Sequence, residues 1–280
     1  MTNAGLKWYV LLRAQGISVP FRAVLSYTYV GFFFSNFLPA NVGGDVMRGY
    51  SLARYTDQAA EAAVSVVVDR IIGLMAFMSA AVVATLIAVF LMGQENLKGV
   101  ETAALVGLAL IFVGFSIILS RRARAVVGRL FAFRLLAPFA AIYNSLSDAL
   151  DAYRHSYGAL GLAFCIALGT LVLTSLTDYF IVQSLGGGIP LIYIFIFNPI
   201  IAFVLAFPIS IGGLGVIQAV YPFFYGLVGV PASLAFTVSL LKQLIIYVTS
   251  LPGAVLWWRG RDRTSEAPTQ PEHAPTPSQS

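Results

Sequence analysis

The stretch NFLPANVGGDVMRGY, residues 36–50, places a proline, two adjacent glycines, an aspartate and an arginine directly after a run of apolar residues. Proline removes a backbone N–H donor, and glycine permits backbone torsions that other residues avoid. The residues from Ala23 to Gly44 carry no charge, as is typical of a segment inside a membrane. We therefore expect an apolar helix to break here at membrane depth.

The composition of the whole chain predicts an all-α polytopic transmembrane bundle. Of its 280 residues 59% are hydrophobic and 10% are charged, whereas soluble domains carry about 25% charged residues. About 20 consecutive apolar residues cross the hydrocarbon core of a bilayer. The runs without Asp, Glu, Lys or Arg are Ala23–Gly44, Ile71–Gln94, Thr102–Ser120, Tyr179–Leu241 and Gln243–Trp258.

The distribution of Lys and Arg predicts the topology, because cytoplasmic loops collect these residues. We place on the inside the basic clusters Lys7/Arg13/Arg22, Arg48/Arg54, Arg121–Arg154 and Arg259/Arg261/Arg263. The loops 94–101 and 186–190 then lie outside. Spans of alternating direction follow at about 62–92, 102–120, 158–184 and 232–258.

The two remaining segments, about 23–61 and 190–231, must each begin and end on one face of the membrane. We therefore predict two helical hairpins, the first entering from the cytoplasm and the second from outside. Residues 1–22 form a cytoplasmic-side segment too short to span, and we expect a first span to be missing. Residues 259–280, rich in Pro, Ser and Thr, are expected to form a disordered cytoplasmic tail.

The two predicted hairpins share a short pattern. LPANVGGDV from Leu38 and FPISIGGLG from Phe207 both have a proline, three residues and then Gly-Gly. The pattern and the opposite orientation predict an inverted repeat of broken helices, although small residues also serve tight helix packing. The predicted breaks are Pro39, Gly43, Gly44, Pro208, Gly212, Gly213 and Gly215.

Broken helices in inverted repeats are a pattern of secondary transporters, in which positive helix N-termini face anionic substrates. Arginine is costly inside a membrane unless it is paired or solvated. We predict that Arg48, Arg70 and Lys242 bind an anionic headgroup; the alternative for Arg70 is that it only extends to the interface. The predicted charge partners and supporting polar groups are Asn41, Asp45, Asp69, Asp178, Ser210 and Gln218, of which Asp178 either pairs with a cation or caps its helix.

Other ligands are not expected from the sequence. The single cysteine, Cys165, excludes an intramolecular disulfide and a multi-cysteine metal site, and we expect it to be a small core residue. The basic residues are dispersed among apolar segments, so nucleic acid is not an expected partner. We expect no metal or other cofactor.

The motifs LPANVGGDVMRGYSLARYT, AAVSVVVDRIIGL, FPISIGGLGVIQ and LLKQLIIYVTSLPGAVLWW resemble the lysylphosphatidylglycerol synthase transmembrane-region family over about residues 11–258. The resemblance implies a flippase-like domain with an inverted-repeat core that handles phospholipids or polyprenyl-linked lipids at the bacterial inner membrane. The matching positions are Pro39, Gly43, Gly44, Arg48, Arg70, Gly212, Gly213 and Gly215.

The chain also departs from the family pattern. Gln218 stands where the family usually has glutamate, and Lys242 where it often has arginine. An ionisable partner is therefore absent at Gln218. No soluble synthase domain follows Trp258, so we do not expect the synthase activity.

Three functions are consistent with these features. We expect the chain to translocate an anionic phospholipid or polyprenyl-linked lipid, with membrane lipids as its partners. A non-catalytic subunit could instead present lipid to a separate lipid-modifying enzyme. A membrane-embedded lipid-phosphate enzyme would use Asp45, Asp69 or Asp178, but we find no catalytic constellation and expect no enzymatic activity. Transport by the purified protein alone distinguishes the first function from the second.

Overall fold

The described part of the computed structural model covers residues 1–38, 42–92, 98–120, 122, 140–154, 156–205 and 210–265. These residues form helices and no strands, so the predicted all-α class is confirmed. The helices are α1 (Thr2–Ala14), α2 (Phe21–Ser35), α3 (Val42–Thr56), α4 (Ala59–Met92), α5 (Lys98–Leu119), α7 (Ala140–Asp151), α8 (Tyr157–Ser184), α9 (Leu191–Leu205), α10 (Val216–Gly226) and α11 (Ala232–Ser265).

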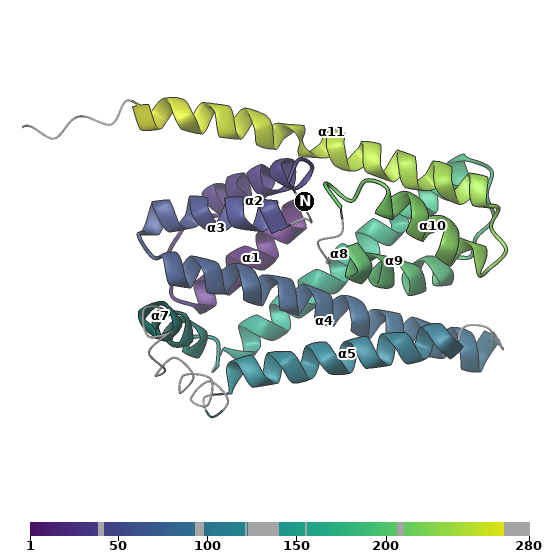
Figure 1. Cartoon of the computed structure of the whole chain (residues 1–280), viewed down its shortest axis with the longest axis horizontal. Coiled ribbons are helices and arrows are strands. Elements are labelled where there is room, and N and C mark those ends of the chain that lie inside the picture. The colour runs from purple at the N-terminus through teal and green to yellow at the C-terminus, as the bar shows by residue number, and fades with distance from the viewer. Residues whose placement is uncertain are drawn as a thin grey trace, which may run out of the picture.

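The longest helices lie along the bundle (Figure 1). Within the described residues, three helices are long and apolar enough to cross a membrane: Ala59–Phe90 of α4, Tyr157–Ser184 of α8 and Ala232–Arg259 of α11. The predicted span 102–120 falls on α5, whose described apolar stretch is Leu105–Ile117. The helical core thus has the length and composition of a multi-pass membrane domain.

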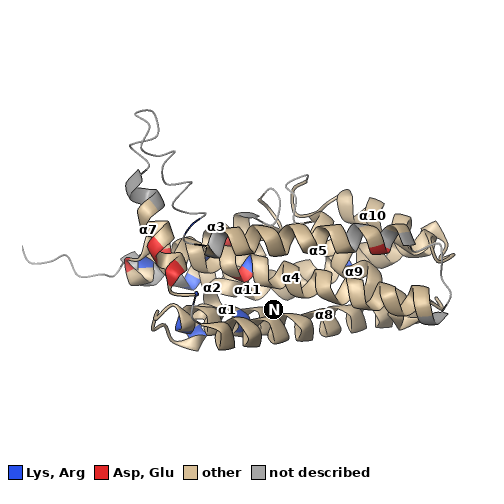
Figure 2. Ribbon diagram, turned by 90° about the horizontal axis from the view of Figure 1, so that it is seen from below, with Lys and Arg blue, Asp and Glu red and all other residues tan. Residues whose placement is uncertain are grey.

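Two helical hairpins enter the bundle from opposite ends, α2–α3 from one and α9–α10 from the other (Figures 1 and 2). Each of the four helices has 15 residues or fewer, which at about 1.5 Å per residue is shorter than the hydrocarbon core. Pro20 and Pro190 directly precede α2 and α9, where the fixed φ of proline favours a helix start. Neither hairpin can therefore cross a bilayer.

The tips of the two hairpins meet near the middle of the bundle. A Cβ added at Gly212 would lie 2.5 Å from the carbonyl oxygen of Asn36, at the tip of the first hairpin. Gly212 and Gly213 have φ of +59° and +77°, which glycine adopts without strain. The opposed orientation of the hairpins is thus present, while the inverted symmetry of the two halves stays a prediction.

Helix α11 holds both tips in place. The Asn36 side-chain amide donates a hydrogen bond to Ser250 Oγ at 2.7 Å, and the Gln243 amide donates to the Gly212 carbonyl at 3.2 Å. A Cβ at Gly253 would overlap the carbonyl oxygen of Tyr29 in α2. One helix therefore packs directly against each hairpin.

The first glycine pair does not supply the predicted backbone break. Gly43 and Gly44 lie inside α3, and a Cβ at Gly44 would overlap the Gly31 carbonyl of α2. The pair therefore allows two helices to approach closely, which is the packing alternative raised by the sequence. Pro39, Asn41 and Pro208 lie outside the described residues.

Two further expectations are wrong. Helix α11 continues as far as Ser265, so residues 259–265 are helical rather than part of a disordered tail; residues 266–280 lie outside the described part. Cys165 is exposed on α8 rather than buried. The apolar surface of a membrane helix faces lipid, so an apolar neighbourhood in sequence does not decide which residues are in the core.

The close approach at Gly44 leads to a stability prediction. Gly44→Val should lower the free energy of unfolding by about 1 to 3 kcal/mol or more, because the new side chain forces α2 and α3 apart. Thermal unfolding in detergent measures the change. Gly114→Val is the matched control, since nothing lies within 4 Å of a Cβ at that helical glycine. Equal stability of the two variants would contradict the packing role of Gly44.

The opposed hairpins lead to a labelling prediction. In a Cys165→Ala background, single cysteines are placed at Gln58 and Gly188. Each position lies at the end of its hairpin that is opposite the tip, and both residues are exposed. An impermeant thiol reagent should reach Gln58→Cys and Gly188→Cys from opposite sides of the membrane. The two positions are compared in sealed cells and inverted vesicles. Labelling of both from one side would contradict the arrangement.

Candidate functional site

A buried carboxylate joins the three helices α1, α3 and α4. Asp69 of α4 has a side chain that is 7% exposed; its Oδ1 lies 3.2 Å from Lys7 Nζ of α1 and its Oδ2 lies 2.8 Å from Arg48 Nη2 of α3. The Lys7 ammonium also donates to the Asp69 backbone carbonyl at 2.8 Å. Two cations thus share one carboxylate in a poorly solvated setting, where charges require partners.

Arg48 is enclosed on several sides. Its Nη2 lies 2.9 Å from Asp45 Oδ1 as well as 2.8 Å from Asp69. The guanidinium lies over the Trp8 ring, 5.0 Å from the centroid, in a cation–π contact. The Trp8 indole donates to Ser65 Oγ at 3.1 Å. Arg48 is therefore held in place and is a positioning residue for Asp45.

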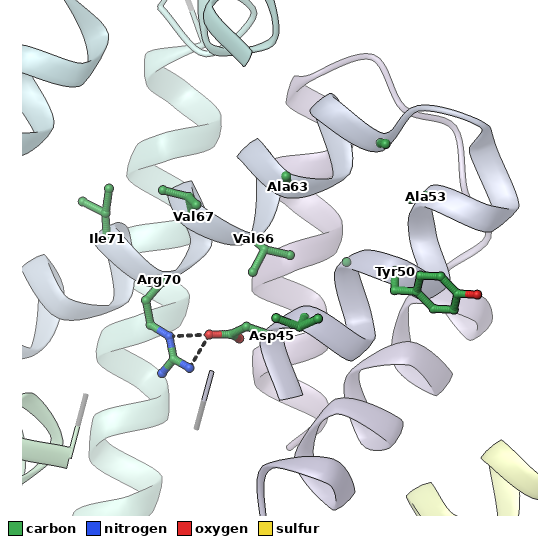
Figure 3. Close-up of a pocket in the computed structure, with 11 residues that line it drawn as sticks. Asp45, Tyr50, Ala53, Ala63, Val66, Val67, Arg70 and Ile71 are labelled. Atoms are coloured by element: carbon green, nitrogen blue, oxygen red, sulfur yellow. Dashed lines mark hydrogen bonds and ion pairs between the residues drawn. The ribbon is translucent and has the colours of Figure 1, made fainter. Parts of the chain in front are cut away.

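Arg70 is the outermost cation of this network. Its Nε donates to Asp45 Oδ2 at 2.8 Å, its Nη2 contacts the same oxygen, and its side chain is 41% exposed. Figure 3 shows the Arg70 and Asp45 side chains pointing toward one another. Arg70 is thus paired and also reachable from outside the bundle.

A groove of about 530 Å³ lies between α3 and α4 beside this pair (Figure 3). Apart from Asp45, Tyr50 and Arg70 its lining is apolar, including Val46, Ala63, Val67 and Ile71. Several lining side chains are exposed at the surface, Val46 by 61%. The groove therefore has a mostly apolar lining, and the Arg70–Asp45 pair lies at its inner end, which is the end nearest the tip of the first hairpin.

A second charge pair lies in the other half of the bundle. Asp178 of α8 is fully buried, and its Oδ2 lies 2.6 Å from Lys242 Nζ of α11. The Tyr221 hydroxyl of α10 donates to the same oxygen at 2.9 Å. Of the two alternatives for Asp178, pairing with a cation is the one that the structure shows.

The structure divides the predicted site residues into two groups. Arg48, Arg70, Asp45 and Asp69 come together beside the groove, while Lys242 and Asp178 form the separate pair. The Gln218 side chain accepts a hydrogen bond from the Gly215 N–H at 2.8 Å and so caps α10. Ser210 lies in the tip of the second hairpin. Asn41 lies outside the described residues.

Lys7 and Tyr221 were missed as site residues. We placed Lys7 with the cytoplasmic basic cluster, but it is buried against Asp69. Its position between apolar residues in GLKWYVLL is the signal that could have found it, because a lone lysine in such a helix needs a partner. Nothing in the sequence distinguishes Tyr221 from the other tyrosines.

The long apolar helices, the short opposed hairpins and the ion pairs between helices define a polytopic integral membrane protein. The chain belongs to the family described as lysylphosphatidylglycerol synthase TM region, which residues 3–253 match. It is 23% identical over 275 residues to the UPF0104 membrane protein PH1989 of Pyrococcus horikoshii, covering 91% of this chain and 82% of that protein. No solved structure matches.

The shared carboxylate leads to a prediction about stability. Asp69→Asn should lower the free energy of unfolding by about 3 to 5 kcal/mol, because it leaves Lys7 and Arg48 buried with too little opposite charge. Thermal unfolding of the purified protein measures the loss.

A double-variant cycle separates charge from packing. Adding Lys7→Met to Asp69→Asn removes one uncompensated cation at similar side-chain length, so the double variant should be more stable than Asp69→Asn alone. The loss of unfolding free energy in the double variant is compared with the sum of the losses in Asp69→Asn and Lys7→Met. If it equals that sum, Lys7 and Asp69 do not depend on one another and the shared-carboxylate interpretation is wrong.

Proposed function

We propose that this protein binds an anionic lipid and moves it across the membrane. The headgroup binds at Arg70, and an acyl or prenyl chain lies in the groove between α3 and α4. The observation that supports this most directly is the position of Arg70, paired but 41% exposed, at the inner end of an apolar groove.

The charge balance of the network favours an anion. Three cations, Lys7, Arg48 and Arg70, face two carboxylates, Asp45 and Asp69. With all five ionised, these described groups together carry one net positive charge, and such a charge acts strongly where water is scarce. A phosphate group on Arg70 would balance it and would form charge-assisted hydrogen bonds with the guanidinium.

The groove between α3 and α4 has a size and lining that suit the acyl or prenyl chain of the proposed anionic lipid. Its volume of about 530 Å³ lies within the range of about 300 to 1,000 Å³ typical of ligand pockets. Its lining is mostly Ala and Val, with Tyr50 as a large exposed side chain. A lipid could therefore enter sideways from the bilayer with its chain against these residues and its headgroup at Arg70.

The opposed hairpins provide a physical reason for translocation rather than binding alone. In transporters built from broken helices, the two halves move around a site near the middle of the membrane. Here the hairpin tips meet at Asn36 and Gly212, and one charge network lies in each half. We propose that Arg70 and Lys242 contact the headgroup on the two sides of these tips.

The orientation and setting of the protein are part of the proposal. In Figure 2 the Lys and Arg residues gather mainly at the end of the bundle near α7. The positive-inside rule supports our proposal that this end is cytoplasmic, with the end of α11 in the cytoplasm of a bacterial cell and the bundle in the inner membrane. Membrane lipids are then the partners, and no chemical conversion of the lipid is proposed.

The proposal predicts the effect of removing the exposed cation. Purified protein in liposomes should move fluorescent phosphatidylglycerol between leaflets, and Arg70→Gln should slow this at least about tenfold, since a lost charge-assisted contact exceeds about 1.4 kcal/mol. Arg70→Lys should retain part of the rate, because it keeps the charge but loses the planar geometry.

A matched variant removes the same charge elsewhere. Arg22→Gln changes an exposed arginine of α2 that does not line the groove, and it should transport at the wild-type rate. Full transport by Arg70→Gln would contradict the headgroup site. Lipid that binds in an Arg70-dependent way but is moved only with an added transferase would instead favour the lipid-presenting subunit.

A further inference from the structure

Among the described residues of α8, α9 and α10, three buried oxygen atoms have no hydrogen-bond partner. They are Asp178 Oδ1, Asn198 Oδ1 and the Tyr225 hydroxyl oxygen, from α8, α9 and α10. The three residues are 0%, 6% and 0% exposed. An unpaired buried polar atom costs about 1 to 3 kcal/mol, so three of them on adjacent helices require an explanation.

Contacts between neighbouring side chains connect the three residues. Tyr221 bonds to Asp178 at 2.9 Å, and its ring centroid lies 5.3 Å from that of Tyr225. The Asn198 amide donates to Ser175 Oγ at 3.3 Å, and Ser175 lies one helical turn before Asp178 on α8. A chain of hydrogen bonds and ring contacts thus connects Asp178, Asn198 and Tyr225 across α8, α9 and α10.

The chemistry of these atoms selects a small hard cation. A carboxylate, an amide carbonyl and a hydroxyl all offer oxygen lone pairs, which hard cations prefer. Pro199 lies inside α9 and has no N–H for the carbonyl of Phe195 four residues earlier; such freed carbonyls coordinate Na⁺ in broken helices. The single negative charge of Asp178 balances a monovalent cation better than a divalent one.

Lys242 occupies the other oxygen of the same carboxylate. Its Nζ lies 2.6 Å from Asp178 Oδ2, and its side chain is 20% exposed. A cation bound at Asp178 Oδ1 would repel this ammonium group at short range. The cation and the lysine therefore compete for Asp178.

We propose that Asp178, Asn198 and Tyr225 form a Na⁺ site, and that Na⁺ bound there displaces Lys242 from Asp178. The role of the site rests on the proposed function: the displaced Lys242 binds the anionic headgroup. The Asp178–Lys242 pair is neutral, so Na⁺ adds one positive charge that the headgroup balances. Binding of Na⁺ and of anionic lipid is then mutually favourable.

Thermal unfolding of the purified full-length protein tests the site without any lipid transport. At constant ionic strength, NaCl should stabilise the protein relative to KCl and to choline chloride. Lys242→Met removes the competing cation, so the Na⁺ concentration for half-maximal stabilisation should fall at least about tenfold. Asp178→Asn combined with Lys242→Met removes both charges without leaving either unpaired, and should abolish the response.

Two variants serve as controls, one beside Asp178 and one in the charge network of the first half. Thr177→Val changes an exposed residue beside Asp178 whose hydroxyl bonds within its own helix, and it should keep the Na⁺ response. Arg70→Gln should keep it too, so loss of lipid transport and loss of Na⁺ binding can be told apart.

Two results would overturn the Na⁺ site. One is equal stability in NaCl and choline chloride for both the wild type and Lys242→Met. The other is a Na⁺ response that survives in the double variant. A stability change that follows pH and not Na⁺ would assign the cluster to a proton and also exclude the proposed ion.

Discussion

The carboxylate of Asp69, shared between Lys7 and Arg48, is the interaction on which the first half of the bundle depends. Charges inside a membrane protein are stable only when they are paired, so this one group decides how α1, α3 and α4 lie against each other. Arg48 in turn holds Asp45 at 2.9 Å, and Asp45 orients Arg70. The exposed cation beside the groove is thus positioned by Asp45, which also lines the groove, and through Asp45 by the buried charges of Arg48 and Asp69, which do not line it.

Each half of the bundle joins two helices through a lysine–aspartate pair, but the order of the two residues along the chain is reversed. In the first half a lysine on α1 meets an aspartate on α4, and in the second an aspartate on α8 meets a lysine on α11. Asp69 and Lys242 each lie about 15 Å along their helix from its first residue, at about 1.5 Å per residue. When all are ionised, the five named groups of the first cluster carry one net positive charge and the Asp178–Lys242 pair carries none.

The sequence predicted the membrane class and the regions of the helices, because charge-free runs and prolines act locally. It predicted the residues of the first site only in part. Arg48, Asp69 and Arg70 stand out as charges in apolar surroundings, but Lys7 lay close to Arg13 and Arg22 and was assigned to the cytoplasm with them. Its burial depends on Asp69, 62 positions away. Likewise, only the packing of α2 against α3 shows that Gly44 serves close approach whereas Gly213 supplies a positive φ.

The contacts of α11 with both hairpins also bear on how the protein is assembled. Hairpins of such short helices cannot stay in lipid as independent spans, and the groups that fix their tips, Gln243, Ser250 and Gly253, all lie on α11. This helix emerges from the ribosome after both hairpins. During synthesis both hairpins must therefore remain incompletely packed until α11 is inserted, which makes the newly made chain dependent on protection by the insertion machinery until that step.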